Sequence, residues 1–146
     1  MTDITIIQPK RYNARHYEAV ARLLTQLTTR SIPFTPDRYR DLLHNGSTTL
    51  FLLQHKSTVI GMLTLSRCLI PTGCKGWIED VVIDSDYRGQ GLGRQLVSHA
   101  IEHARHEGYD SLMLTSAPKR IAANALYRAL GFEHKETNVY TYPISR

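Results

Sequence analysis

The sequence lacks the features of a membrane, secreted or disulfide-rich protein. No apolar run approaches the roughly 18 residues that a membrane span needs, and the first residues, Met1 to Ile4, lack the basic and then apolar regions of a signal peptide. The two cysteines, Cys68 and Cys74, are too few for a disulfide framework and lack zinc-site spacing. We therefore expect a cytoplasmic protein with reduced thiols and no membrane partner.

The sequence also lacks any run of five or more like charges. Its formal net charge is +5 and its pI is about 9.4, a balance that favours anionic ligands. The basic residues are dispersed, however, and no nucleic-acid recognition module is visible. We therefore do not expect a nucleic-acid partner.

Length and composition are those of one globular domain. The 146 residues contain 42% hydrophobic and 21% charged residues, which is ordinary for a single core. No repeat or low-complexity segment divides the chain. We expect one domain over residues 1–146.

The stretch from Trp77 to His106 combines a strand, a glycine-rich turn and a helix. Residues 77–83 are mostly β-branched or aromatic, as in a buried strand, but they include Glu79 and Asp80. Residues 88–94 read Arg-Gly-Gln-Gly-Leu-Gly-Arg. Apolar residues then recur at helical spacing until Gly108 supplies a stop.

The glycine-rich turn predicts an anion site at the start of this helix. Glycines at alternate positions let a ligand approach the backbone, and the first helical turn leaves N–H groups without intrahelical acceptors. The helix N-terminus carries a partial positive charge, and Arg88 and Arg94 flank it. A phosphate or diphosphate is the expected ligand.

The turn matches neither of two common phosphate-binding sequence motifs. A P-loop requires Lys and then Ser or Thr after the last glycine, whereas Arg94 and Gln95 follow Gly93. In a dinucleotide fingerprint an acidic residue ends a second strand, whereas Asp110 comes just after the helix. A tight turn without a ligand is the remaining alternative.

The turn resembles the acetyl-CoA-binding motif of the GNAT superfamily of N-acetyltransferases. That motif, Arg/Gln-x-x-Gly-x-Gly/Ala, is matched by Arg88, Gly91 and Gly93, and the resemblance extends over residues 48–142 with Asn124 and Tyr127 before Leu130-Gly131-Phe132. It implies acetyl-CoA as cosubstrate and no metal. The implied cofactor-binding residues are Val81, Val82, Ile83, Arg88, Gly89, Gln90, Gly91, Leu92, Gly93, Arg94 and Asn124.

The order of elements predicts an α/β sandwich around a mixed sheet. Strands are expected at residues 2–8, 48–55, 58–67, 77–83 and 111–116, and an extended segment at 139–142. Helices are expected to begin after Asn13, Thr35 and Gly91 and near Ile121, and residues 71–76 to form a loop. The resemblance implies that strands 77–83 and 111–116 are parallel and splay apart to admit acetyl-CoA.

Glu79 is the candidate general base. A lysine-like amine, with a pKa near 10.4, costs about 4–5 kcal/mol to deprotonate at neutral pH, so a base in the central strand is useful, acting directly or through water. Asp80 faces the other way in a regular strand, but a bulge could exchange their roles. The alternative is that these carboxylates are paired within the sheet.

Tyr127 is the candidate acid for the departing thiolate, because the resemblance places the family's acid in its Asn-x-x-Tyr motif. The alternative is a tyrosine buried in a helix core. A backbone N–H, best that of Val81, is expected to bind the developing oxyanion, and Asn124 to cap polar groups of the cofactor.

The other reactive residues, histidines and cysteines, give little indication of a metal site or of a covalent intermediate. His99, His103 and His106 share one helix face with partial zinc-ligand spacing, but a solvated flank is the better interpretation. Cys68 and Cys74 show no Cys–His–acid arrangement for a covalent intermediate, so direct transfer in a ternary complex is expected.

The resulting hypothesis is an acetyl-CoA-dependent N-acetyltransferase acting on a small-molecule or peptide amine. A small amine, an amino-sugar phosphate, a polyamine and a protein amino terminus all stay open as acceptors, and so does a homodimer. Residues 79–82 and 88–93 resemble those of glucosamine-phosphate N-acetyltransferases. The rival function is a non-catalytic acyl-CoA-binding or regulatory module.

Overall fold

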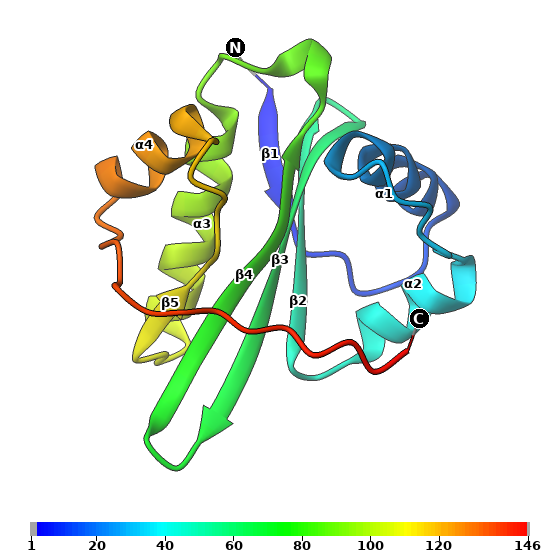
Figure 1. The fold of residues 1–146 in the computed structure, drawn as a ribbon. Helices are drawn as coiled ribbons and strands as arrows, with labels where there is room; N and C mark the ends of the chain where they lie inside the picture. The colour runs from blue at the N-terminus through cyan, green and yellow to red at the C-terminus, as the bar shows by residue number, and fades with distance from the viewer. Residues whose placement is uncertain (1–2, 146) are drawn as a thin grey trace. The chain divides into compact units, whose positions relative to one another are not determined.

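The computed structural model describes residues 3–145, and these divide into two compact units on either side of the boundary between Thr115 and Ser116. The first unit holds a five-stranded sheet and three α-helices (Figure 1). Its elements are β1 (Ile4–Ile7), α1 (Ala14–Leu27), α2 (Pro36–His44), β2 (Thr48–His55), β3 (Thr58–Ile70), β4 (Gly73–Ile83), the 3-10 turn η1 (Ser85–Tyr87), α3 (Leu92–His106) and β5 (Ser111–Met113).

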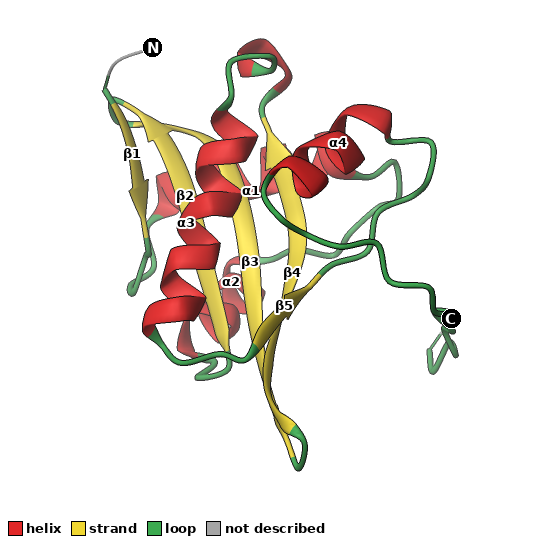
Figure 2. Cartoon of the chain, turned by 90° about the vertical axis from the view of Figure 1, so that its left-hand side faces the viewer, coloured by secondary structure: helices red, strands yellow, loops and turns green. Residues whose placement is uncertain are grey.

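The strands follow one another in chain order, β1-β2-β3-β4-β5. The first four are antiparallel neighbours, whereas β4 and β5 are parallel. Their pairing begins at Lys75 with Ser111 and ends at Trp77 with Met113, so the rest of β4 continues without β5 (Figure 2). This mixed sheet confirms the predicted α/β class.

Helices α1 and α2 begin where a local side chain accepts hydrogen bonds from backbone N–H groups of the first turn. The Asn13 side chain accepts hydrogen bonds from the backbone N–H groups of Arg15 and His16, at 2.9 and 3.1 Å. The Thr35 hydroxyl accepts from the N–H of Arg38, and Pro36 occupies the first turn of α2. These caps explain why both boundaries were predictable from the sequence.

The two faces of the sheet are covered by different helices. Figure 1 shows α1 and α2 on one side and α3 on the other. Met62 and Val82 belong to the core cluster that includes Leu23 of α1 and Tyr39 of α2. On the opposite face, the ring of Phe51 lies 4.9 and 5.1 Å from the rings of His99 and His103 in α3.

The second unit contains α4 (Ile121–Ala129) and the segment that follows it. The backbone N–H of Phe132 donates to the carbonyl of Tyr127 at 3.0 Å, which closes the end of α4. The predicted helix at residues 121–130 is confirmed to within one residue. That both units form one domain stays a prediction.

Two expectations about local structure were wrong. Residues 73–76 form a strand rather than a loop, because β3 and β4 continue as a hairpin to the pair Ile70–Gly73. The strand expected at 111–116 ends at Met113, where its pairing with β4 stops. Residues 139–142 belong to none of the described strands, and their expected extended conformation stays a prediction. Thr2, expected in the first strand, lies outside the described residues.

Candidate active site

A β-bulge interrupts β4 directly after Glu79. Glu79 lies opposite Thr64 of β3, and the next registered pairs are Val82 with Met62 and Ile83 with Gly61. Asp80 and Val81 therefore have no registered partner, and Asp80 adopts a left-handed conformation with φ of 51°. A bulge of this kind redirects side chains and leaves backbone groups outside the ladder. The Val81 N–H predicted to bind an oxyanion lies in this bulge.

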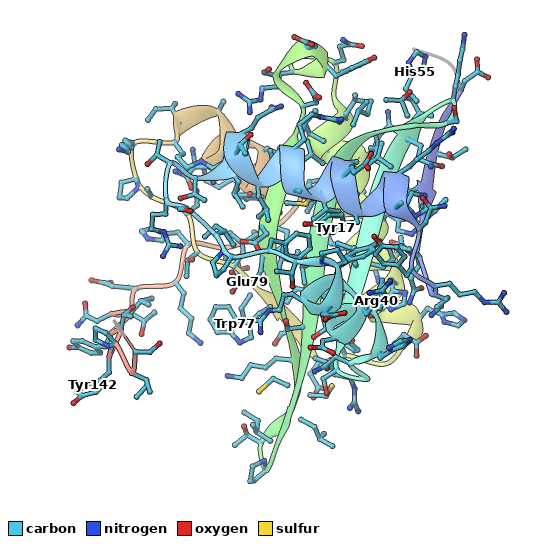
Figure 3. The ribbon with its side chains drawn as sticks, turned by 90° about the vertical axis from the view of Figure 1, so that its right-hand side faces the viewer. Tyr17, Arg40, His55, Trp77, Glu79 and Tyr142 are labelled. Carbon is cyan, nitrogen blue, oxygen red and sulfur yellow. The ribbon has the colours of Figure 1, made fainter. Side chains whose placement is uncertain are left out.

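The Glu79 side chain lies on the face of the sheet that α1 and α2 cover. Thr64 is two residues from Met62 on β3, so both point to the same face, and Met62 packs in the core cluster with residues of α1. Glu79 is the cross-strand partner of Thr64 and shares that face. Figure 3 views the molecule from this side and labels Glu79.

The surroundings of the Glu79 carboxylate increase its affinity for a proton, as a general base requires. Desolvation by the surrounding protein raises the pKa of its carboxyl group, and the neighbouring Asp80 carboxylate raises it further. Its side chain nevertheless stays exposed, so solvent can carry a proton away. Within residues 3–115 the carboxylate has no ion-pair partner, which argues against the purely structural alternative.

Beyond Trp77, one edge of β4 is left open where β5 separates from it. The open part contains Val81, Val82 and Ile83, the strand residues expected to bind the cofactor. Backbone N–H and C=O groups along such an edge require other hydrogen-bond partners. The amides of an extended ligand such as pantetheine match that requirement.

The glycine turn leads into an open helix N-terminus. Gly89 and Gly91 have φ of 79° and 76°, values that favour glycine. Gly91 caps α3 without any side-chain hydrogen bond, and the first intrahelical bond runs from Gln95 N to Gly91 O at 3.2 Å. The preceding N–H groups, those of Leu92, Gly93 and Arg94, have no intrahelical acceptor.

The space at this turn suits a diphosphate. Within residues 3–115, no heavy atom beyond those of the glycine and its two chain neighbours lies within 4 Å of the position that a Cβ would take at Gly89 or Gly91. Gln90 is exposed between them, whereas the Leu92 side chain is buried and anchors the helix. The residues present therefore fit the diphosphate of coenzyme A, with backbone donors and the positive end of α3 as its binding groups.

Arg88 and Arg94 lie on either side of the turn, and both are exposed. The Nε of Arg88 donates a hydrogen bond to the carbonyl of Ile83 at 3.0 Å, which folds this side chain back toward the end of β4. Arg94 lies in the first turn of α3. Both guanidinium groups therefore belong to residues next to the glycine turn, and their role toward an anion stays a prediction.

Three polar side chains that the sequence analysis missed hold the junction between β4 and the turn. Arg22 of α1 donates to the carbonyl of Val59 at 2.9 Å and lies 3.6 Å from the carboxylate of buried Asp84. Gln26 accepts from the N–H of Ser85 at 2.8 Å. Arg22 and Gln26 are four residues apart on the polar side of α1, which is the only sequence signal that could have indicated them.

Lys75 and Trp77, which were not predicted as site residues, lie on the same strand as Glu79. They alternate with Glu79 along β4, so all three side chains share one face of the strand. Figure 3 shows Trp77 next to Glu79 beside β4. The pattern Lys-x-Trp-x-Glu was visible in the sequence, but the loop wrongly expected at residues 71–76 concealed it.

The other two predicted site residues belong to the second unit. Tyr127 is buried in α4, and its ring centroid lies 5.9 Å from that of Phe132. The amide nitrogen of Asn124 donates to the carbonyl of Ala117 at 3.0 Å, which ties α4 to the loop before it. Their roles toward a cofactor stay predictions.

The remaining candidate groups form no second centre in the described chain. Residues 3–145 contain no cluster of three or more His, Cys, Asp or Glu side chains suited to a metal ion. Cys68 and Cys74 are free thiols. His99 and His103, expected on a solvated flank, contact Phe51, and His103 is half-buried. None of the helices in this part of the chain is long and apolar enough to cross a membrane.

Comparison with known proteins agrees with this geometry. The acetyltransferase (GNAT) family model matches residues 17–132. Glucosamine 6-phosphate N-acetyltransferase 1 of Oryza sativa subsp. japonica is 30% identical over 130 residues, which cover 82% of this chain and 76% of the rice protein. The [ribosomal protein bS18]-alanine N-acetyltransferase of Escherichia coli (strain K12) is 38% identical over 64 residues, covering 44% of this chain and 43% of that protein.

The fold agrees with a solved structure as well. An aminoglycoside acetyltransferase from an uncultured soil metagenomic sample superimposes with a TM-score of 0.84 at 17% identity, covering 99% of this chain and 97% of that one. The family match includes the β4 bulge, the glycine turn and α3. The chain therefore belongs to the GNAT acetyltransferase family and is an acyltransferase that uses acetyl-CoA.

Proposed function

We propose that this protein transfers the acetyl group of acetyl-CoA to a primary amine by direct attack in a ternary complex, without a metal. The observation that carries the proposal is the arrangement of Glu79, the bulge at Asp80–Val81 and the open N-terminus of α3 in one unit. Acetyl-CoA supplies an acetyl group activated as a thioester. The protein supplies the groups that bind it, accept a proton and donate one.

In this proposal Glu79 accepts the proton of the attacking amine, directly or through a water molecule. An amine with a pKa near 10.4 costs about 4–5 kcal/mol to deprotonate at neutral pH. A carboxylate whose pKa is raised is a stronger base, so the transfer becomes less unfavourable. The exposure of Glu79 leaves room for the acceptor beside it.

The N–H of Val81 is proposed to donate a hydrogen bond to the acetyl oxygen as negative charge develops there. The bulge supports this role, because Val81 has no registered partner on β3 and lies on the part of β4 that β5 leaves open. A backbone donor fixed before the reaction needs little reorganisation during it.

Tyr127 is proposed to protonate the departing thiolate. A phenol hydroxyl can donate a hydrogen bond and then a proton to a nascent thiolate. The family resemblance of Asn124 and Tyr127 supports the assignment. The substitution Tyr127→Phe tests this assignment.

A more specific candidate for the acceptor is an amino-sugar phosphate. The rice relative, a glucosamine 6-phosphate N-acetyltransferase by name, is 30% identical over most of this chain. A peptide amino terminus is the second candidate, because the E. coli relative is named as an alanine N-acetyltransferase of a ribosomal protein and is 38% identical over 64 residues. We place the reaction in the cytoplasm, as the sequence suggested; a homodimer is left open.

The test of the proposal is a thiol-release assay with acetyl-CoA against a panel of amines, combined with calorimetry of acetyl-CoA binding. We expect binding, and release of free coenzyme A that depends on one class of amine. Binding without turnover of any amine would support the rival function, a non-catalytic acyl-CoA-binding module. Absence of binding would contradict both functions.

A further inference from the structure

The proposed acceptor side of β4 carries three side chains in a row, which we call the acceptor row: Lys75, Trp77 and Glu79. They alternate along the strand and therefore point to the same face. At a rise of about 3.3 Å per residue, the Cα atoms of neighbouring members are about 6.6 Å apart, and those of Lys75 and Glu79 are about 13 Å apart. Figure 3 shows the Trp77 indole next to Glu79.

The strand beside the acceptor row presents small polar side chains. Across the β3–β4 ladder, Thr64 lies opposite Glu79, Ser66 opposite Trp77 and Cys68 opposite Lys75. All three are half-buried, whereas Met62, the next residue of β3 on this face, is 2% exposed beneath α1. This face of the sheet therefore changes at Thr64 from apolar core residues to small polar residues. The Trp77 indole lies beside these polar residues.

The ends of the acceptor row carry opposite charges. Glu79 and its neighbour Asp80 are acidic, Lys75 is basic, and the indole between them is uncharged. A ligand complementary to this row carries its amine at the Glu79 end, a ring with an apolar face over Trp77 and an anionic group near Lys75. A linear polyamine would instead bring a second ammonium group toward Lys75, and an α-amino acid is too short to reach both ends.

We propose, on the basis of the proposed function, that the acceptor is a cyclic primary amine bearing a phosphate, that is, an amino-sugar phosphate. Trp77 then provides the surface on which the ring stacks, and Lys75 binds the phosphate. Lys75 and Trp77 are specificity-determining residues, while Glu79 keeps its role toward the amine.

The experiment compares four acceptors with the whole protein: D-glucosamine 6-phosphate, D-glucosamine, spermidine and a peptide with an amino-terminal alanine. We expect kcat/KM for glucosamine 6-phosphate to exceed that of each of the others by 10-fold or more. In Lys75→Ala the ratio between phosphorylated and unphosphorylated glucosamine should fall about 10–100-fold, the usual effect of one charge-assisted contact.

Two control variants isolate the contribution of Lys75. Lys75→Arg keeps a cation and should retain most of the preference for the phosphate. Lys10→Ala removes the same charge from an exposed residue just after β1, at the opposite edge of the sheet from β5, and should leave the ratio as in the parent. If Lys75→Ala lowers both kcat/KM values equally, or if spermidine or the peptide is preferred, the inference is wrong even though the transferase stands.

Fluorescence provides a readout that is independent of turnover. Trp77 is the only tryptophan among the 146 residues, so the intrinsic indole emission reports on this position alone. Titration with glucosamine 6-phosphate in the presence of coenzyme A should change the emission, and Lys75→Ala should shift the midpoint about 10–100-fold to higher concentration. No change in emission would overturn the inference; no thiol release with any amine would instead overturn the proposed function.

Discussion

Glu79 of β4 lies opposite Thr64 of β3, and the next registered pair is Val82 with Met62. Two residues of β4, Asp80 and Val81, are thus opposed by the single residue Leu63. The bulge keeps Glu79 and Val82 on the face of α1 while it places a left-handed Asp80 between them. The Glu79 carboxylate and the backbone N–H of Val81, a residue without a registered partner, consequently come within two residues of each other.

Glu79→Gln should lower kcat/KM about 10²–10³-fold, because the amide keeps the shape of the side chain but cannot accept a proton. Steady-state kinetics with acetyl-CoA and the best amine measure this effect. The matched control is Asp80→Asn, since asparagine tolerates the positive φ at this position. A larger loss in Asp80→Asn than in Glu79→Gln would assign the base to Asp80.

The pH dependence of kcat/KM should change in the same variant. The raised pKa of Glu79 means that its active, unprotonated form is reached at a higher pH than in an ordinary glutamate. In the parent, kcat/KM should therefore rise with pH through that raised pKa, and Glu79→Gln should lack this rise. An unchanged acidic limb in the variant would show that another group titrates.

Gly91→Ala should weaken acetyl-CoA binding and destabilise the fold by about 1 kcal/mol, because alanine disfavours the left-handed conformation with φ of 76°. Gly108→Ala is the matched control, since Gly108 has φ of 78° at the other end of α3 and equally open surroundings. Both variants should lose similar stability in urea unfolding. Calorimetry should show weaker binding in Gly91→Ala alone; equal affinities would remove the glycine turn from the binding site.

Tyr127→Phe should lower kcat about 10²–10³-fold with little change in acetyl-CoA affinity, since it removes only the proton-donating hydroxyl. The ring contact with Phe132 is retained, so the fold should be preserved. Turnover and calorimetry on the same preparation separate chemistry from binding. A variant as active as the parent would exclude Tyr127 as the proton donor.

Arg22→Ala should lower the free energy of unfolding by about 1 kcal/mol, because the half-exposed guanidinium pairs with Asp84 and solvent screens part of that interaction. It also loses the hydrogen bond to the carbonyl of Val59. Urea unfolding measures the change, and Arg15→Ala, an exposed residue on the first turn of the same helix, is the control. Equal stabilities would show that Arg22 does not hold the junction.

Stability should decrease as the pH falls below the ordinary imidazole pKa of about 6.5. Burial lowers the pKa of His16, and burial together with His103 lowers that of His99, so in this range the unfolded chain binds more protons than the folded one. Urea unfolding between pH 7.5 and about 5 tests the direction. His99→Gln should flatten the dependence more than His106→Gln, which alters an exposed imidazole on the same helix.

Local features made most elements predictable. Asn13 and Thr35 cap their helices through side chains that act within three residues, and Gly108 ends α3 through its own backbone conformation. The glycine turn was recognisable for the same reason, since Gly89 and Gly91 adopt positive φ irrespective of distant contacts. The hairpin of β3 and β4 was misjudged because Gly73 and Gly76 resemble loop residues unless their cross-strand partners are known.

Local sequence patterns were enough to indicate the elements and the groups they carry: a glycine turn before a helix, a carboxylate in a central strand and a family motif. How these groups meet depends on the folded arrangement. The register of β3 against β4 produces the bulge after Glu79, the end of the β4–β5 pairing at Trp77 opens the strand edge, and Arg22 reaches Asp84 from another element. Each depends on contacts between residues far apart in the chain, which local propensity does not encode.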